Sequence, residues 1–395
     1  MSKHILLLNC GSSSMKYQLF DPEAATALAV GIVERIGQDQ GKLKHEVGGE
    51  EFVVEKPFPN HTVAFAEVVA AFEKYGPSLD GVQAVGHRTV HGGSTFREST
   101  LITDEVIAKL VELSGLAPLH NPPGIAGIEA AMALLPDVPH VGIFDTAFFS
   151  TLPPEAYTYA IDREVAEKFG IRRYGFHGTS HSYVSKKAAE FLGRPIEELK
   201  LIVCHLGNGA SISAVAGGVA VDTSMGLTPL EGLVMGTRSG NIDPGLFKFL
   251  GDKGYSPEEI DDLLNKKSGM GGLCGFTDMR DVDDQIDAGN EQAKLAMDVY
   301  IHRLISYIGA YIAVLGGVDA LVFTAGIGEN GSTVRGGAVR RLRNLGFILD
   351  EEANAVRAKE PRTISTPESP VKVLVVPTNE ELAMAQDTLR VIRAK

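Results

Sequence analysis

The sequence has only three cysteines among its 395 residues, Cys10, Cys204 and Cys274, and they lie far apart. An odd number of widely separated cysteines excludes a disulfide framework and the close ligand spacing of a zinc site. Sparse cysteine is typical of a reducing compartment, and we expect a cytoplasmic location. The opening residues run directly into a short apolar strand, without the longer apolar core and cleavage site of a signal peptide.

Long apolar runs and positive charge are scarce as well. The most apolar segment, residues 304–323, contains Gly316, Gly317 and Asp319, so it fits a buried helix followed by a strand at residues 320–324 better than a membrane span. Asp and Glu outnumber Lys and Arg by 50 to 37, which gives a formal net charge of −13. This balance argues against a nucleic-acid partner. Any anionic ligand must find local cations.

Two familiar phosphate-binding signatures are also missing. The sequence contains neither the P-loop pattern nor the signature set of protein kinases. Its length exceeds that of a single hydrophobic core, and its 44% hydrophobic content can fill two. We place the boundary at the turn 151–154, with one domain of residues 1–151 plus 383–395 and a second of residues 152–382.

Two glycine-rich hairpins are the most informative feature of the chain. One strand at residues 5–9 and another at residues 201–206 each run into a tight polar turn, around Gly11 and Gly209, and then into a second strand. Glycine lets the backbone approach a ligand closely, and Ser, Asn and free N–H groups can surround an anion. The two turns lie about half the chain length apart, which indicates a duplicated nucleotide-handling domain and phosphoryl transfer in a cleft between the domains.

Elsewhere strand-like and helix-like segments alternate, which predicts an α/β fold. Strands are expected at 5–9, 15–20, 27–33, 84–87, 141–144, 201–215 as a hairpin, 320–324 and 371–376. Helices are expected at 62–75, 104–113, 124–135 and 381–393, the last of which could return to the first domain. The glycine-rich segment 268–275 is expected to be a loop.

Polar side chains gather where strands of the first half are expected to end. Residues 86–93 place two histidines and Arg88 between glycines, and the alternative is a solvated basic loop. Asp145 follows the strand at 141–144, where an ordinary helix N-cap is the alternative. Open α/β sheets bind ligands at the carboxyl ends of their strands, so we expect both groups to face a ligand.

The second half carries histidines and arginines of the same kind. His177 and His181, four residues apart at a helix start, could ligate a metal, but no third ligand stands near them in the sequence. Arg238 lies between glycines and Arg280 follows Asp278, although single arginines are common on protein surfaces.

Two carboxylates follow strands near the end of the chain. Residues 323–330 predict a strand that enters a glycine-rich turn with an acid and an amide. Glu380 follows the strand at 371–376, where it could hold Mg²⁺ through water or cap a helix.

These segments together resemble the acetokinase family, the acetate kinases, over essentially the whole chain. The matching segments, in family order, are NCGSSSMKY, GHRTVHGG, APLHNPPG, FDTAF, RYGFHGTSH, HLGNGAS, MGTRSG, FTAGIGEN and TNEE. The resemblance implies two duplicated actin-like, ribonuclease H-like domains and transfer of the γ-phosphoryl group of ATP to acetate. It also implies Mg²⁺ as cofactor, with Mn²⁺ as a substitute, and a homodimer.

The resemblance assigns roles to the matching positions. The catalytic residues would be Arg88, Asp145, His177 and Arg238. The acceptor pocket would contain Arg88, Val90, Leu119 and Pro229, and the metal ligands would be Asn9 and Glu380. The phosphate loop would include Ser12 and Ser14. The nucleotide would contact Lys16, His205, Leu206, Gly207, Asn208, Gly209, Asp278, Met279, Arg280, Gly326, Ile327, Gly328, Glu329 and Asn330. The chain departs from the family pattern at Cys10, where alanine is common, and at Asn241, where aspartate is frequent.

Elementary chemistry limits what these residues must do. A carboxylate acceptor is ionised at neutral pH, so no general base is needed, and Asp145 would orient an arginine or the metal. Arg88, Arg238 and His177 would offset the repulsion between two anions. A kinase for propionate or another short-chain carboxylate would differ mainly in the acceptor pocket. An actin-like switching ATPase would share the fold without needing this cluster.

Overall fold

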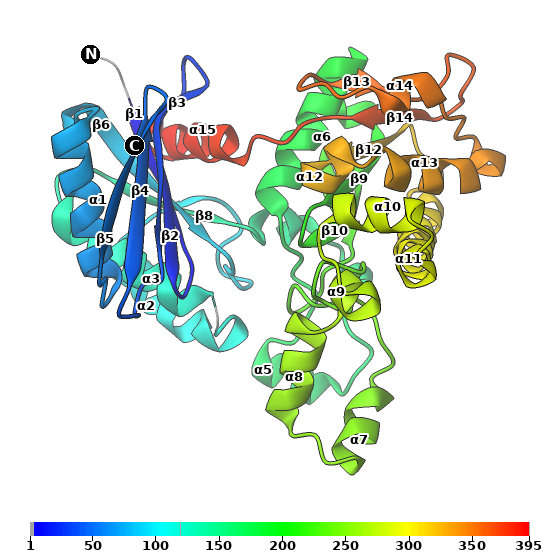
Figure 1. The fold of residues 1–395 in the computed structure, drawn as a ribbon, viewed down its shortest axis with the longest axis horizontal. Helices are drawn as coiled ribbons and strands as arrows, with labels where there is room; N and C mark the ends of the chain where they lie inside the picture. The colour runs from blue at the N-terminus through cyan, green and yellow to red at the C-terminus, as the bar shows by residue number, and fades with distance from the viewer. Residues whose placement is uncertain (1–3, 119, 395) are drawn as a thin grey trace. The chain divides into compact units, whose positions relative to one another are not determined.

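The computed structural model describes residues 4–118 and 120–394, so the expected pocket residue Leu119 lies outside the described residues. The chain forms two compact units, Met1–Ser150 with Asn379–Lys395, and Thr151–Thr378 (Figure 1). Each unit is built on one mixed β-sheet with helices packed against it. The predicted α/β class is confirmed.

In the described part of the first unit, eight strands pair in the order β5-β4-β3-β2-β1-β6-β8-β7. β1, β6 and β8 are mutually parallel, and the remaining neighbours are antiparallel. The strands are β1 (His4–Cys10), β2 (Ser14–Asp21), β3 (Thr26–Glu34), β4 (Gly41–Val47), β5 (Glu50–Lys56), β6 (Val82–Thr89), β7 (Thr100–Leu101) and β8 (His140–Phe144). The helices are α1 (His61–Tyr75), α2 (Asp104–Glu112), α3 (Asn121–Leu134) and α15 (Glu380–Arg393).

The centre of this sheet is covered on both faces, which explains the apolar run of β1. Leu6 and Leu8 belong to a core that includes side chains of α1 and α3. Leu7 faces the other way, toward α15. A strand buried on both faces needs an unbroken apolar sequence rather than an alternating one.

In the described part of the second unit, six strands pair in the order β11-β10-β9-β12-β14-β13. They are β9 (Lys200–Leu206), β10 (Ala210–Ala216), β11 (Val219–Thr223), β12 (Ala320–Thr324), β13 (Arg362–Thr363) and β14 (Lys372–Val375). The helices are α4 (Pro154–Tyr157), α5 (Arg163–Phe169), α6 (Gly178–Leu192), α7 (Gly245–Asp252), α8 (Pro257–Lys266), α9 (Gly269–Cys274), α10 (Met279–Asp287), α11 (Glu291–Leu315), α12 (Ala325–Asn330), α13 (Ser332–Arg341) and α14 (Glu351–Ala355).

The two sheets repeat one topology, as the paired hairpins predict. The order β3-β2-β1-β6-β8 of the first unit matches β11-β10-β9-β12-β14 of the second, with the same parallel and antiparallel pairings. The hairpins β1–β2 and β9–β10 therefore occupy equivalent places. The expected duplication is confirmed at the level of topology.

After the last parallel strand of each unit the chain enters the other unit and supplies a long helix to that unit's sheet. α6 follows β8 in the chain but packs on β9 and β12, whereas α15 follows β14 but packs on β1, β6 and β8 (Figure 1). Asn379 caps α15 by accepting a hydrogen bond from Leu382 N. The chain therefore crosses between the units twice.

Two local expectations are corrected, and one hairpin is new. The segment 268–275, expected to be a loop, contains the helix α9, and the expected glycine-rich turn after β12 is the short helix α12. The hairpin β4–β5 was not anticipated, although Gly48 and Gly49 join two alternating strands with positive φ at both positions. Among the described residues, no helix has the length and apolar content required to span a bilayer.

The packing of α15 on the first sheet gives a double-mutant test. A Cβ at Gly86 of β6 would lie 2.5 Å from Thr388 Oγ1 of α15, so Gly86→Ala should overpack the contact and cost about 1–3 kcal/mol of stability. Thr388→Ala removes the nearest of the atoms that crowd this position, so the double variant should lose less stability than the sum of the two single losses, by at least about 0.5 kcal/mol. Urea unfolding of the four proteins measures this coupling, and strictly additive losses would contradict the contact.

Candidate active site

In the first unit, Arg88 and Asp145 form a fixed ion pair. Arg88 lies near the end of β6 and Asp145 directly follows β8, and Arg88 Nε and Nη2 donate to the two carboxylate oxygens at 3.0 and 2.8 Å. The side chain of Asp145 is only 3% exposed, whereas that of Arg88 is 26% exposed. The charge of Asp145 raises the pKa of Arg88 above its ordinary value, although burial opposes the shift. The carboxylate therefore orients a permanently charged guanidinium that still reaches solvent.

The alternative of a solvated basic loop is wrong. His87 and His91 are 3% and 0% exposed, so residues 86–93 do not form such a loop. Both oxygens of Asp145 accept hydrogen bonds from Arg88.

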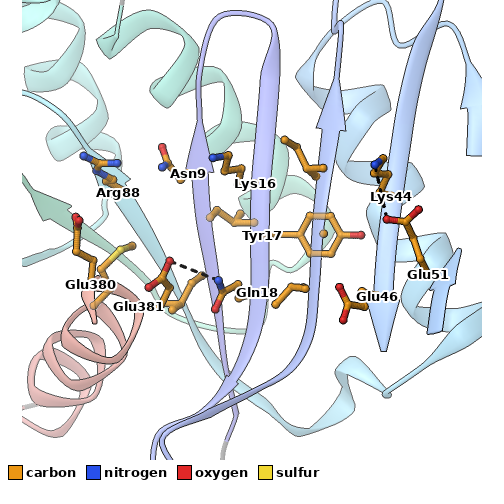
Figure 2. Close-up of a pocket in the computed structure, with 16 residues that line it drawn as sticks. Asn9, Lys16, Tyr17, Gln18, Lys44, Glu46, Glu51, Arg88, Glu380 and Glu381 are labelled. Atoms are coloured by element: carbon orange, nitrogen blue, oxygen red, sulfur yellow. Dashed lines mark hydrogen bonds and ion pairs between the residues drawn. The ribbon is translucent and has the colours of Figure 1, made fainter. Parts of the chain in front are cut away.

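Arg88 shares one face of the sheet with two other expected site residues. Asn9 on β1 pairs in register with Lys16 on β2 and with Arg88 on β6. Figure 2 shows the three side chains side by side, with Glu380 and Glu381 of α15 approaching from below. Together they line part of a pocket of about 450 Å³ that continues along the sheet toward Lys44 and Glu51 on β4 and β5.

The carboxylate of Glu380 is buried without enough nearby positive charge to offset its own negative charge. Burial raises its pKa to about 7, the nearby charge of Arg88 opposes the shift, and the negative charges of Asp145 and Glu381 add to it. A carboxylate with surplus negative charge beside the amide oxygen of Asn9 is a hard oxygen donor set of the kind that binds Mg²⁺ together with water and phosphate oxygens. The two residues thus fit the expected metal, with Asn379 rather than Glu380 providing the helix cap.

Hydrogen bonds to Gly11 fix the turn of the first hairpin. Gly11 N donates to Ser14 O at 2.8 Å, and His61 at the start of α1 lies 2.8 Å from the Gly11 carbonyl through Nε2. Ser12 is exposed and Ser14 is half-buried. Burial raises the pKa of the adjacent Cys10 to about 12, so its thiol is neutral at physiological pH.

In the second unit, His177 and Arg238 meet at the turn of the second hairpin. A Cβ placed on Gly209 would lie 3.5 Å from His177 Nε2 and 3.6 Å from Arg238 Nη1. Glycine at this position therefore leaves room for both side chains. Arg238 Nη1 also donates to the carbonyl of Pro229 at 3.2 Å, which places that acceptor-pocket candidate beside it.

Arg238 is a guanidinium without a counter-ion. Within residues 4–118 and 120–394 it forms no ion pair with a carboxylate, and burial lowers its pKa from the ordinary value. A half-buried cation that lacks a protein anion is suited to an anionic ligand.

The loop that carries Arg238 is held by the helix that was expected to be a loop. Ser268, Met270 and Gly271 donate backbone hydrogen bonds of 2.8–3.0 Å to the carbonyls of Thr237, Met235 and Gly236. The backbones approach so closely that a Cβ on Gly269, which has φ +62°, would lie 2.2 Å from Met235 O. Gly269 therefore serves close packing rather than flexibility.

Histidines and serines form a buried network behind the second hairpin. Ser211 Oγ lies 2.9 Å from His177 Nδ1 and 2.7 Å from His181 Nε2, and Ser213 Oγ lies 2.7 Å from His181 Nδ1. His205 stacks on His177 with ring centroids 4.3 Å apart. Among the described residues, no three His, Cys, Asp or Glu side chains form a metal-binding group, so the alternative of metal ligation by His177 and His181 finds no support.

The two serines are site residues that the sequence reasoning missed. Both lie on β10 and point to one buried face of an otherwise apolar strand. That alternation of serine within a buried strand was the available signal, because buried hydroxyls require partners.

The other nucleotide-binding candidates are only partly brought together. α12, which contains residues 326–330, packs on the end of β9: a Cβ on Gly207 would lie 3.9 Å from Ala325 Cβ. Glu329 Oε1 accepts from the backbone N–H groups of Ala325 and Thr378, so its carboxylate has a structural use. Asp278 and Arg280 sit at the exposed start of α10 and pair with each other, which lowers the pKa of Asp278 to about 2.

Val90 is half-buried just beyond β6, next to His91. The backbone of His91 is clamped by the amide of Asn121, which accepts from His91 N and donates to His91 O. Arg88 and Val90 lie in the first unit and Pro229 in the second, and the acceptor pocket stays a prediction.

The repeated actin-like topology, the two glycine-rich hairpins and the clustered arginine and histidine side chains define a phosphotransferase of the actin-like class. A model of the acetokinase family matches residues 4–386, and the chain belongs to this family. It is 52% identical over 394 residues to an acetate kinase of Carboxydothermus hydrogenoformans, with 98% of this chain and 99% of the relative covered.

Solved structures give the same result. A crystal structure of Porphyromonas gingivalis acetate kinase has a TM-score of 0.95 and 47% identity, covering 99% of this chain and all of the other. A propionate kinase from Francisella tularensis has a TM-score of 0.92 and 42% identity, covering 98% of this chain and all of the other. The expected family is confirmed.

The contact between α9 and the Arg238 loop can be tested by two alanine substitutions. Gly269→Ala must tolerate a positive φ and displace the carbonyls of Met235 and Arg238, so it should cost roughly 1–3 kcal/mol of stability and lower kcat. Gly275→Ala is the matched control, since Gly275 has φ +84° with open space around its Cβ position. Gly275→Ala should lower the stability of the protein while leaving kcat unchanged. Equal losses of kcat in the two variants, measured at saturating substrates, would contradict this role of α9.

The raised pKa of Glu380 predicts a carboxyl titration near neutral pH. ¹³C NMR of glutamate-labelled protein should show one carboxyl with a midpoint of about 7, moving to lower pH when Mg²⁺ and ADP are added, because a cation favours the ionised form. Glu380→Gln should remove this signal and Glu381→Gln should retain it. Between the ordinary glutamate pKa and about pH 7, the folded state keeps a proton on Glu380 that the unfolded state has released. The contribution of this group to the free energy of unfolding is therefore lost as the pH rises toward 7. A midpoint near 4.5 would refute the assignment.

Proposed function

We propose that this chain transfers the γ-phosphoryl group of ATP to the carboxylate of acetate, giving acetyl phosphate and ADP, and that the reaction is reversible. The observation that carries the proposal is the unpaired guanidinium of Arg238 beside His177 Nε2 at the glycine turn. This arrangement supplies positive charge and a hydrogen-bond donor where a phosphoryl group would gain negative charge on its equatorial oxygens.

In this proposal Arg88 binds the acceptor carboxylate, and Asp145 keeps the guanidinium in place. The acceptor is already ionised, so Asp145 has no proton to remove, and its bidentate contact with Arg88 leaves both oxygens occupied. Arg88 would neutralise the acceptor, and His177 and Arg238 would act on the phosphoryl group. The expected gain comes from positioning and charge neutralisation.

Asn9 and Glu380 would hold Mg²⁺ through direct or water-mediated contacts. When bound, the ion neutralises charge on the phosphate oxygens. Lys16 lies in register with Asn9 and would add a cation to the same phosphate group. The homodimer and the cytoplasmic location stay predictions.

The likeness to a propionate kinase makes a larger acceptor the second candidate. Val90 and Pro229 would set the room for the acceptor's alkyl group, and one methylene changes discrimination by only about 1–3 kcal/mol. Acetate and propionate should therefore both react, with acetate preferred. A switching ATPase would hydrolyse ATP without needing either acid.

The test is hydroxylamine trapping with ATP, Mg²⁺ and each acid. Acetate should give acetohydroxamate in an amount equal to the ADP formed. Release of phosphate without hydroxamate would indicate an ATPase, and more efficient turnover of propionate would refute acetate as the preferred acceptor.

The same assay tests Arg238. Arg238→Ala should lower kcat by roughly 10³–10⁵-fold, because it removes the charge that offsets the transition state. Circular dichroism and the unfolding midpoint should change little. Arg194→Ala, which removes an exposed arginine paired with Asp319 before β12, is the control and should keep full activity. Unchanged turnover in Arg238→Ala would remove this residue from the mechanism.

A further inference from the structure

The buried network of Ser213, His181, Ser211 and His177 has only two complete arrangements of protons. Each neutral imidazole offers one donor and one acceptor, and each hydroxyl has one hydrogen to donate. Ser211 lies between two ring nitrogens, so it can donate to only one of them. The protonated nitrogen of His177 is therefore coupled to that of His181.

In the first arrangement Ser213 donates to His181 Nδ1, His181 Nε2–H donates to Ser211, and Ser211 donates to His177 Nδ1. His177 then carries its hydrogen on Nε2, the nitrogen that lies beside Gly209 and Arg238. In the second arrangement every bond runs the other way. His177 Nδ1 then carries a hydrogen, and a neutral His177 presents a bare Nε2.

Ser213 decides between the two arrangements. It is fully buried, and within residues 4–118 and 120–394 its hydroxyl has His181 as its single hydrogen-bond partner. In the second arrangement Ser213 would accept from His181, and its own O–H would be left without an acceptor. A buried unsatisfied donor costs about 1–3 kcal/mol, so the first arrangement is favoured.

The surroundings of His177 also disfavour a positive ring. It is the N-cap of the 15-residue helix α6, whose N-terminus carries partial positive charge. The guanidinium of Arg238 lies near Nε2, and the neighbouring rings of His205 and His181 supply no negative charge. Burial and the charge of His205 lower the pKa of His181 well below its ordinary value, which keeps the connecting ring neutral.

We infer that Ser213, His181 and Ser211 are positioning residues that hold His177 as a neutral imidazole with its hydrogen on Nε2. His177 then acts on the transferring phosphoryl group as a hydrogen-bond donor, and Arg238 supplies the charge. This inference rests on the proposed function for the role of the donor, but the tautomer itself is independent of activity.

The direct test is long-range ¹H–¹⁵N NMR of histidine-labelled protein at pH 7, with His177→Gln to assign the ring. The wild type should show a neutral His177 with protonated Nε2 and unprotonated Nδ1. A doubly protonated ring or a bare Nε2 would overturn the inference. This measurement needs no turnover, so it separates a failure of the inference from a failure of the proposed function.

Two serine variants test the chain of bonds. Ser211→Ala removes the donor to His177 Nδ1 and should produce a mixture of tautomers and lower kcat by about 10–100-fold, with little change in KM for ATP. Ser213→Ala touches His181 and not His177, yet it should move the ¹⁵N pattern of His177 in the same direction.

Ser185→Ala is the matched control. Like the other two serines, Ser185 has a fully buried hydroxyl, but it lies on α6. Its hydroxyl donates to the backbone carbonyl of His181 and takes no part in the hydrogen bonds between the rings and the serines of β10. Ser185→Ala should leave the His177 tautomer and kcat unchanged. An unchanged His177 pattern in Ser213→Ala, or an equal change in Ser185→Ala, would overturn the inference.

Discussion

An acidic protein must still present positive charge to anionic ligands, and each unit meets this constraint in a different way. The chain has a net charge of −13, yet Arg238 is half-buried without a carboxylate partner in the described structure. Leaving a cation desolvated costs stability, so the surrounding backbone must fix it firmly. The amides at the start of α9 bind the carbonyls of the Arg238 loop and provide that support. Arg88 solves the same problem differently, because Asp145 holds it while its side chain still reaches solvent.

The duplicated hairpins have taken on different chemistry at equivalent positions. In the first unit Asn9 pairs in register with Lys16, and both side chains reach the pocket. In the second unit His205 pairs in register with Ser211, which lies behind His177. The first hairpin thus offers the amide oxygen of Asn9 and the flexible cation of Lys16. The second hairpin offers the space left by Gly209 and a rigid set of histidine rings. One backbone topology supports both because the pleat fixes which side chains face the ligand.

Much of the fold and part of the site could be predicted from the sequence. Strand endings located Arg88, Asp145 and Glu380, because apolar runs followed by polar residues mark the carboxyl ends of parallel strands. The helix α9 could not be predicted in this way, since Gly269 at its start is required by a backbone contact with residues distant in the chain. Ser211 and Ser213 were missed for a similar reason. A serine in a strand carries no sign of which histidine it will meet.

The chain passes between the units twice, and each passage leads to a helix that starts at a candidate site residue. Asp145 ends the last parallel strand of the first unit, and the chain then supplies α6, which packs on the second sheet and begins at His177. The chain leaves the second unit after β14 and supplies α15, which begins at Glu380 and packs on the first sheet. Each crossing therefore connects a strand end in one unit to a candidate site residue at the start of a helix on the other. A rearrangement of either crossing would move both a supporting helix and the reactive side chain at its first turn.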